Sequence, residues 1–185
     1  MQENETYNKQ NFSNIQLSRQ YDGCDFINCN FENMILSDIT FMECKFTNCN
    51  LSNVKINYTA FKSVSFDNCK LVGINFNESN PFLLNFKFNQ CDLTLASFYQ
   101  LKIKNTVFDN CNLQEVDFSG CDLSNSFFEN CDLSRAIFEN SKLEKTDFVT
   151  AINFHINPAT NKLKKAKFST ENIQGLLHHL DITIS

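Results

Sequence analysis

Cysteine is the residue type that could supply the most chemistry in this chain, which has nine Cys and three His among 185 residues. A zinc site needs thiolate or imidazole ligands that converge, typically from spacings such as Cys-x-x-Cys. The nearest cysteines are five residues apart, and His155, His178 and His179 lie beyond the last cysteine. The spacing favours buried thiols that behave as small apolar side chains. We therefore expect no metal and no cofactor.

Motifs of nucleophilic or phosphate chemistry are missing from the sequence. It contains no GxSxG, no GxxxxGK[ST] and no GxGxxG, the patterns that position a nucleophilic Ser or cradle a phosphate. The Ser, His and Asp residues are too scattered to indicate a triad. We predict that the protein is not an enzyme.

Large apolar residues recur every five positions, and the cysteines lie at a constant place in this repeat. The repeat runs from Phe26 to Phe76, slips by two residues within 77–82, and resumes at Leu83 to continue to Phe148. Every fifth residue in both stretches is Phe, Leu or Ile. This period matches neither the roughly 3.6 residues of a helical turn nor the alternation of a strand. It predicts a chain that turns a corner every five residues.

All nine cysteines lie two residues before such an apolar centre, so this position favours a small side chain that points inward. Similar strings, such as FTNCNL and FDNCKL, recur every 20 residues, so four pentapeptides make one coil. The Asn and Gln residues two positions after one set of centres, from Asn28 to Asn130, fit a ladder of turns. Stacked coils predict a core ladder of Phe26, Phe46, Phe66, Phe88, Phe108, Phe128 and Phe148. They also predict a cysteine ladder of Cys29, Cys49, Cys69, Cys91, Cys111 and Cys131.

The strings NCNL, QCDL, GCDL and NCDL resemble the pentapeptide-repeat motif A(D/N)LXX, with Cys in place of Ala. The resemblance implies an all-β solenoid, a right-handed quadrilateral β-helix of pentapeptide repeats with a short C-terminal α-helix. The predicted regions are an N-terminal tail or cap (1–20), the β-helix (21–168, with a looser loop at 150–162) and a C-terminal helix and short strand (169–185).

The C-terminal tail, residues 156–185, has the sequence INPATNKLKKAKFSTENIQGLLHHLDITIS. It resembles the C-terminal module of the Qnr-type and microcin-immunity-type proteins that protect DNA gyrase, and in those proteins the module makes a dimer. Its apolar residues follow a helical spacing and exceed what a simple cap needs. A monomeric cap is the alternative. The predicted dimer interface consists of Ile173, Leu176, Leu177, Leu180 and Ile182.

Charge and hydropathy limit the partners and the location. The net charge of −5 disfavours a nucleic-acid partner, which needs clustered Lys and Arg. No apolar run approaches the roughly 18 residues of a membrane span, and residues 1–10 contain no signal-peptide pattern. We expect no membrane association and a cytoplasmic location.

Two functions are open at this point. The resemblance implies a DNA mimic that binds a type II topoisomerase (DNA gyrase or topoisomerase IV) and gives resistance to quinolones or other gyrase poisons, although the long loops of several Qnr-type proteins are missing. The alternative is a structural or protein-interaction scaffold with an unknown partner. Between 105 and 141 seven carboxylates oppose Arg135 alone, a density comparable with that of duplex DNA or simply a solvated acidic surface. These acidic residues are Asp109, Glu115, Asp117, Asp122, Glu129, Asp132 and Glu139.

Overall fold

A left-handed backbone residue at each corner converts the five-residue period into a coil. The computed structural model describes residues 1–82, 84–180 and 182. Two residues after most apolar centres φ is positive, for example 54° at Asn48 and 51° at Asn110. Asn tolerates this conformation better than most residues because its short polar side chain can bond locally. Positive φ also occurs throughout the predicted turn ladder of Asn28, Asn48, Asn68, Gln90, Asn110 and Asn130.

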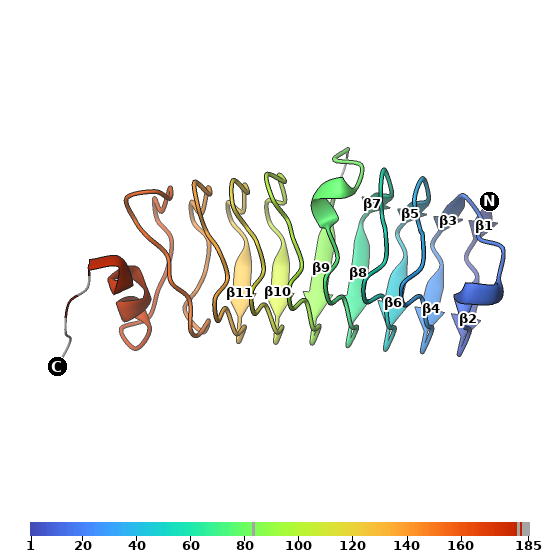
Figure 1. Cartoon of the computed structure of the whole chain (residues 1–185), viewed down its shortest axis with the longest axis horizontal. Helices are drawn as coiled ribbons and strands as arrows, with labels where there is room; N and C mark the ends of the chain where they lie inside the picture. Colours follow the sequence, from blue (N-terminus) through green and yellow to red (C-terminus); the bar gives the residue numbers. More distant parts are fainter. Residues whose placement is uncertain (83, 181, 183–185) are drawn as a thin grey trace.

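The strands are short and all pair in parallel, so the chain forms a rod with its termini at opposite ends (Figure 1). One sheet has the order β1-β3-β5-β7 and the other β2-β4-β6-β8-β9-β10-β11. The predicted all-β solenoid is confirmed, and its right-handed winding stays a prediction. The strands are β1 (Gln2–Glu3), β2 (Thr6–Asn8), β3 (Gln20–Asp22), β4 (Asp25–Ile27), β5 (Thr40–Met42), β6 (Lys45–Thr47), β7 (Ala60–Lys62), β8 (Val64–Asp67), β9 (Phe86–Asn89), β10 (Val107–Asp109) and β11 (Phe127–Glu129). The 3-10 turns are η1 (Phe12–Asn14), η2 (Phe76–Glu78), η3 (Ile173–Leu176) and η4 (His178–Leu180).

Each coil has four faces, which we number in chain order by the apolar residues at their centres. Strand pairs and isolated bridges keep residues of one face in register from coil to coil. Face 1 is centred on Tyr7, Phe26, Phe46, Phe66, Phe88, Phe108, Phe128, Phe148 and Phe168. Face 2 is centred on Phe12, Phe31, Leu51, Leu71, Leu93, Leu113 and Leu133. Face 3 is centred on Leu36, Ile56, Phe76, Phe98, Phe118 and Phe138. Face 4 is centred on Tyr21, Phe41, Phe61, Ile103, Leu123, Leu143 and Leu163.

The phenylalanines of face 1 stack along the rod axis. The rings of Phe26 and Phe46 lie 4.6 Å apart with an angle of 10° between their planes, and those of Phe108 and Phe128 lie 4.9 Å apart at 9°. Phe26, Phe46 and Phe108 are fully buried. Burying one such side chain contributes roughly 1.5–3 kcal/mol, so the ladder is a main source of stability.

Several Cys, Ser and Thr residues two positions before a centre donate hydrogen bonds to backbone carbonyls of the preceding coil. Cys49 donates its S–H to the carbonyl oxygen of Phe26 at 3.2 Å, and Thr59 donates its hydroxyl to that of Leu36 at 2.7 Å. All nine cysteines are buried free thiols. Burial raises the pKa of Cys121 to about 12, so this group stays protonated at neutral pH. The cysteine phase therefore supplies small hydrogen-bond donors to the core.

Where the repeat has an Asp or Asn before the centre, its side chain fixes the first half of the corner. The side-chain oxygen of Asn50 accepts from the backbone N–H of Ser52 at 3.0 Å, and that of Asp132 accepts from Ser134 at 3.0 Å. Such Asx turns hold the backbone in a bend without glycine. This explains how a chain with only 4 Gly and 2 Pro turns so often.

Residues 1–20 form the first coil on the N-terminal end of the rod. Strand β1 pairs with β3 and β2 with β4, and the ring of Tyr7 stacks on that of Phe26 at 5.0 Å. Residues 1–14 therefore cover the N-terminal end of the coil that follows them. The N-terminal segment repeats the pairing of the coils, with Tyr at the place of the ladder Phe.

A loop leaves face 4 where the sequence register slips (Figure 1, green). The offset between paired strands is 20 residues for β6 and β8 but 22 for β8 and β9, where Phe66 pairs with Phe88. The extra residues lie between Asn80, which still donates to the carbonyl of Thr59, and Asn85, which donates to that of Phe61. Leu83, where we predicted the register to resume, lies outside the described residues.

The predicted C-terminal α-helix is wrong, because residues 173–180 form the two 3-10 turns η3 and η4. An isolated helix shorter than about 12 residues is marginal, and Gly175 in its middle costs about 1 kcal/mol relative to Ala. Gly175 also lies so close to Phe154 that the contact with the last coil dictates the backbone path. Of the predicted strand at 182–184, all but Ile182 lies outside the described residues.

Candidate interaction surfaces

The C-terminal cap, residues 169–180, is fastened to the last coil by a few specific hydrogen bonds. The N–H of Ile156 donates to the carbonyl of Gly175 at 3.0 Å. The amide of Asn172 donates to the carbonyls of Phe148 at 2.8 Å and Ala151 at 2.9 Å. A Cβ atom at Gly175 would collide with the carbonyl oxygen and ring of Phe154. The cap therefore depends on a glycine at this point of contact.

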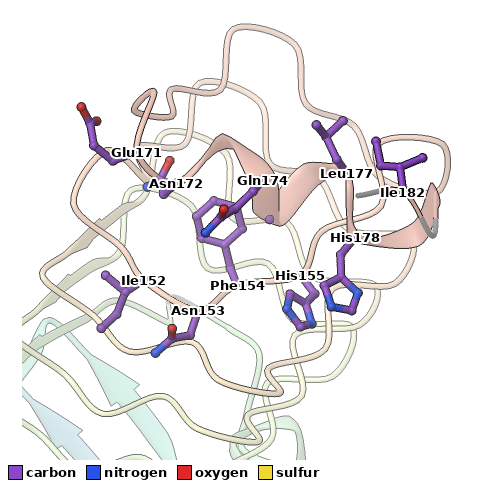
Figure 2. A pocket seen from close by; sticks show the side chains of 11 residues that line it. Ile152, Asn153, Phe154, His155, Glu171, Asn172, Gln174, Leu177, His178 and Ile182 are labelled. Atoms are coloured by element: carbon purple, nitrogen blue, oxygen red, sulfur yellow. The ribbon is translucent and has the colours of Figure 1, made fainter. Parts of the chain in front are cut away.

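A pocket of about 440 Å³ lies between the cap and the last coil (Figure 2). On one side of it the rings of His155 and His178 stack with centroids 3.8 Å apart. Burial lowers the pKa of His155, and the neighbouring His178 lowers it further, so docking favours a neutral imidazole. Glu171 and Asn153 also line the pocket. The pocket is partly polar and belongs to the joint between cap and coil.

The five residues of the predicted dimer interface do not share one face. Leu176 packs against the core, and Leu177 is half-buried. Ile173, Leu180 and Ile182 are exposed, with 44%, 51% and 56% of their surfaces accessible. A 3-10 turn has three residues per turn rather than about 3.6, so the predicted helical stripe splits. Three large apolar side chains still face outward at this end.

The seven predicted acidic residues are distributed over all four faces. Asp109 and Glu129 are register partners on face 1. Glu115 and Asp132 lie at face 2, and Asp117 and Glu139 lie on face 3. Asp122 lies on face 4, where only 7% of its side chain is exposed.

Glu115 and Asp132 are among the carboxylates that local partners hold. Glu115 forms an ion pair with Arg135 at 2.5 Å. Partial burial alone would raise the pKa of Asp132, but hydrogen bonds from Ser134, Asn153 and Gln114 lower it to about 2. The carboxylate of Asp132 therefore stays ionised throughout the physiological range.

Face 4 beyond the loop carries a group of lysines that was not among the predicted site residues. Asp122 forms ion pairs with Lys104 at 3.3 Å and with Lys142 at 3.8 Å. Lys102, Asp122, Lys142 and Lys162 follow one another as bridge partners. Their 20-residue spacing was the signal in the sequence that could have revealed this basic surface.

Among the described residues, no group of three or more His, Cys, Asp or Glu side chains is arranged to hold a metal ion. Within the same part of the chain, no helix has the length and hydropathy to cross a membrane.

The five-residue repeat that builds the coils is also the pattern of a known protein family. A model of the pentapeptide repeat region matches residues 20–87 and 83–176. The chain belongs to the pentapeptide-repeat family. No curated protein sequence matches it.

Solved pentapeptide-repeat structures share the fold at low sequence identity. Two trypsin-treated variants of QnrB1, a plasmid-mediated fluoroquinolone resistance protein, match with TM-scores of 0.52 and 0.50 at 16% and 17% identity. Each match covers 100% of this chain and 99% of the QnrB1 chain. HetL from the cyanobacterium Nostoc sp., involved in heterocyst differentiation regulation, matches over 90% of this chain and 86% of its own, with a TM-score of 0.44 and 15% identity.

Proposed function

We propose that this pentapeptide-repeat protein is a non-enzymatic binding protein that mimics DNA and engages a type II topoisomerase. The shared fold with QnrB1, a fluoroquinolone resistance protein, and the resemblance of the tail to gyrase-protecting proteins support this proposal. The consequence would be resistance to quinolones or other gyrase poisons. The proposal includes a cytoplasmic location, where buried cysteines stay reduced.

The observation that carries the proposal is the acidity of faces 1 to 3 in the C-terminal half of the rod. From residue 86 to residue 167 these faces carry eight carboxylates against Lys87, Arg135 and Lys167, of which Lys167 pairs with Asp147. The carboxylates recur from coil to coil, and coils are spaced by about 4.8 Å. Duplex DNA carries one negative charge per about 1.7 Å, so a protein that binds the duplex electrostatically meets a similar field. The eight residues are Asp92, Asp109, Glu115, Asp117, Glu129, Asp132, Glu139 and Asp147.

We further propose that two copies join end to end through the C-terminal cap. The exposed apolar side chains of Ile173, Leu180 and Ile182 support this proposal. A two-fold interface uses the same patch on both subunits. The resulting rod would carry an acidic body on each side of a central joint, and would match a long DNA-binding surface better than one copy does.

Gyrase supercoiling assays with and without ciprofloxacin test the proposed function. The wild type should restore supercoiling in the presence of the drug. Glu115→Gln/Glu129→Gln/Glu139→Gln removes three exposed charges from the acidic faces and should weaken protection roughly tenfold or more. The matched control, Glu5→Gln/Glu32→Gln/Glu43→Gln, makes the same charge change at exposed positions in the N-terminal coils and should protect normally. No protection by the wild type, or equal loss in both variants, would contradict the proposal.

Light scattering tests the dimer. Leu180→Asp places a charge in the exposed apolar patch and should give monomers at tens of micromolar while the circular dichroism stays unchanged. Ile35→Asp changes an apolar residue that is 65% exposed near the other end, and should leave the dimer intact. A monomeric wild type would exclude the end-to-end dimer.

A scaffold with another protein partner is the second candidate, favoured by exposed aromatic residues around the loop. Phe82 in the loop is 66% exposed, and Tyr58 and Tyr99 are 74% and 45% exposed. Tyr58 lies beside η2, since its N–H donates to the carbonyl of Glu78. Aromatic anchors of this kind are typical of protein interfaces. Partner binding that is lost in Phe82→Ser but retained in the Glu115→Gln/Glu129→Gln/Glu139→Gln variant would favour this function.

A further inference from the structure

Face 4 beyond the loop consists of four successive pentapeptides whose outward side chains are mostly basic. These are residues 101–105, 121–125, 141–145 and 161–165, with the sequences LKIKN, CDLSN, SKLEK and NKLKK. All the lysines in them are exposed. They are Lys102, Lys104, Lys142, Lys145, Lys162, Lys164 and Lys165.

Charge is segregated between this face and the other three. Face 4 has seven lysines against Asp122 and Glu144, a net of five positive charges. Over residues 86–167 the other faces carry eight carboxylates against three basic residues. The overall charge of −5 therefore averages over a strongly basic and a strongly acidic side. A net charge of −5 is thus compatible with a nucleic-acid partner at this face.

The fold arranges the lysines as a regular array. Lys142 and Lys162 are partners in a parallel bridge, so their backbones lie about 4.8 Å apart. Lys162 and Lys164 lie two residues apart on the same face, about 6.6 Å along the chain. From Lys102 to Lys162 the array extends over three coil spacings, about 14 Å along the rod. Its regular spacing along the rod suits an extended polyanion.

Asp122 fixes the array rather than neutralising it. Its carboxylate is 7% exposed and accepts a hydrogen bond from Ser124 at 2.7 Å. It lies between Lys104 at 3.3 Å and Lys142 at 3.8 Å, while these lysine side chains are 53% and 49% exposed. The carboxylate thus holds two ammonium groups in place and leaves them accessible from outside.

The composition of the face indicates which polyanion it fits. Among the described residues, the exposed large hydrophobic side chains lie elsewhere than on these four pentapeptides. Protein interfaces depend on aromatic or apolar anchors and are depleted in Lys. Sequence-independent binding of nucleic acid depends almost entirely on charge, through Lys and Arg against phosphates. We infer that face 4 binds the phosphate backbone of duplex nucleic acid without sequence preference.

Fluorescence anisotropy with a labelled 20-base-pair DNA duplex and the full chain tests this inference, without any topoisomerase present. The wild type should bind at 50 mM salt, and its affinity should fall with salt with a log–log slope of about −4 if four to five phosphates are contacted. Lys142→Gln/Lys162→Gln/Lys164→Gln should bind at least tenfold more weakly, with a slope smaller by about 3. Changing the sequence of the duplex should leave the affinity unchanged.

The matched control is Lys45→Gln/Lys70→Gln/Lys87→Gln, which removes three exposed lysines from faces 1 and 2. It changes the net charge equally and should bind like the wild type. Circular dichroism should show that both variants keep the wild-type fold. No binding of the duplex at 50 mM salt, or equal weakening in both variants, would overturn the inference. Equal or tighter lysine-dependent binding of polyglutamate or of phosphatidylserine vesicles would also overturn it, in favour of an acidic protein or a membrane. Because gyrase is absent, these outcomes are separate from those of the supercoiling assay.

Discussion

Phe108 and Phe154 are both buried aromatic residues, yet the chain holds them in different ways. Phe108 stacks between Phe88 at 5.1 Å and Phe128 at 4.9 Å, with ring planes within 9° of parallel. Phe154 is tilted by 45° to Phe148 and lies under Gly175 of the cap. In the coils each residue is held by copies of itself above and below. In the cap a few unrepeated contacts decide the conformation, so we expect the coils to be stable and the cap to open more easily.

The largest effect should come from cutting the ladder. Phe108→Ala removes a fully buried ring from mid-ladder and should lower the free energy of unfolding by about 3–5 kcal/mol, measured by urea denaturation. The control is Phe127→Ala, which truncates a ring that is 46% exposed in the next coil and should cost less than about 1 kcal/mol. Equal losses for the two variants would mean that ring stacking is not the main source of stability of the coils.

A smaller and local effect should follow from filling the space at Gly175. Gly175→Val forces the cap away from Phe154 and should destabilise docking by about 1–3 kcal/mol, as overpacking does. Limited proteolysis should then cut near residue 170 while the strand signal in circular dichroism persists. Gln174→Val, at the exposed neighbouring position, should leave the cap resistant. If strand signal and cap are lost together, the cap and body form one cooperative unit.

Substitutions at the corners should lower stability less than those in the phenylalanine ladder or at Gly175. The backbone of Asn105 lies in the left-handed region, with φ of 59°. Asn105→Ala should cost about 1 kcal/mol because Ala tolerates the left-handed region poorly, whereas Asn105→Gly should be nearly neutral. Thermal unfolding of the three proteins measures the difference. A cost for Gly equal to that for Ala would show that the amide contributes more than its backbone tolerance.

The smallest effect concerns pH and the histidine pair. The pKa of His155 is lowered in the docked cap, so the undocked cap binds more protons. Docking is therefore fully present above the ordinary histidine pKa of about 6.5 and weakens as the pH falls through the lowered pKa. Proteolysis of the cap should be faster at pH 5 than at pH 7.5, and His155→Phe should remove much of this dependence. Glu139, Glu171 and His179 line the adjoining pockets and set the remaining charge.

The coils contain all the thiols of the protein, and the cap contains none. The nine cysteines should resist thiol labelling in the folded protein, and nine labels should appear after denaturation without reductant. Two or more native disulfides would contradict the proposed cytoplasmic location, since such bonds rarely persist in a reducing compartment.

The sequence by itself determined the body. A large apolar residue every five positions, with a small residue two positions before it, leaves little choice but a coil with four faces, because each side chain must repeat in register with the next coil. Thus the repeat alone predicts Phe26 for the ladder, Cys49 for the small inward position and Asn110 for a corner. The distribution of lysines on face 4 was also present in the 20-residue period, although the net charge obscured it.

Only the tertiary structure decided the ends of the rod and the path of the loop. Apolar spacing in the cap indicated a helix, but the contact of Gly175 with Phe154 and the hydrogen bonds of Asn172 select 3-10 turns. Likewise, the five-residue period of Tyr7 and Phe12 is offset by one residue from that of the later coils, yet β1 and β2 pair with β3 and β4. The physical reason is the same at both ends. The repeat period places each residue of a coil against the equivalent residues of the adjacent coils. An end segment departs from that period, so its conformation depends on its contacts with the coil that it covers.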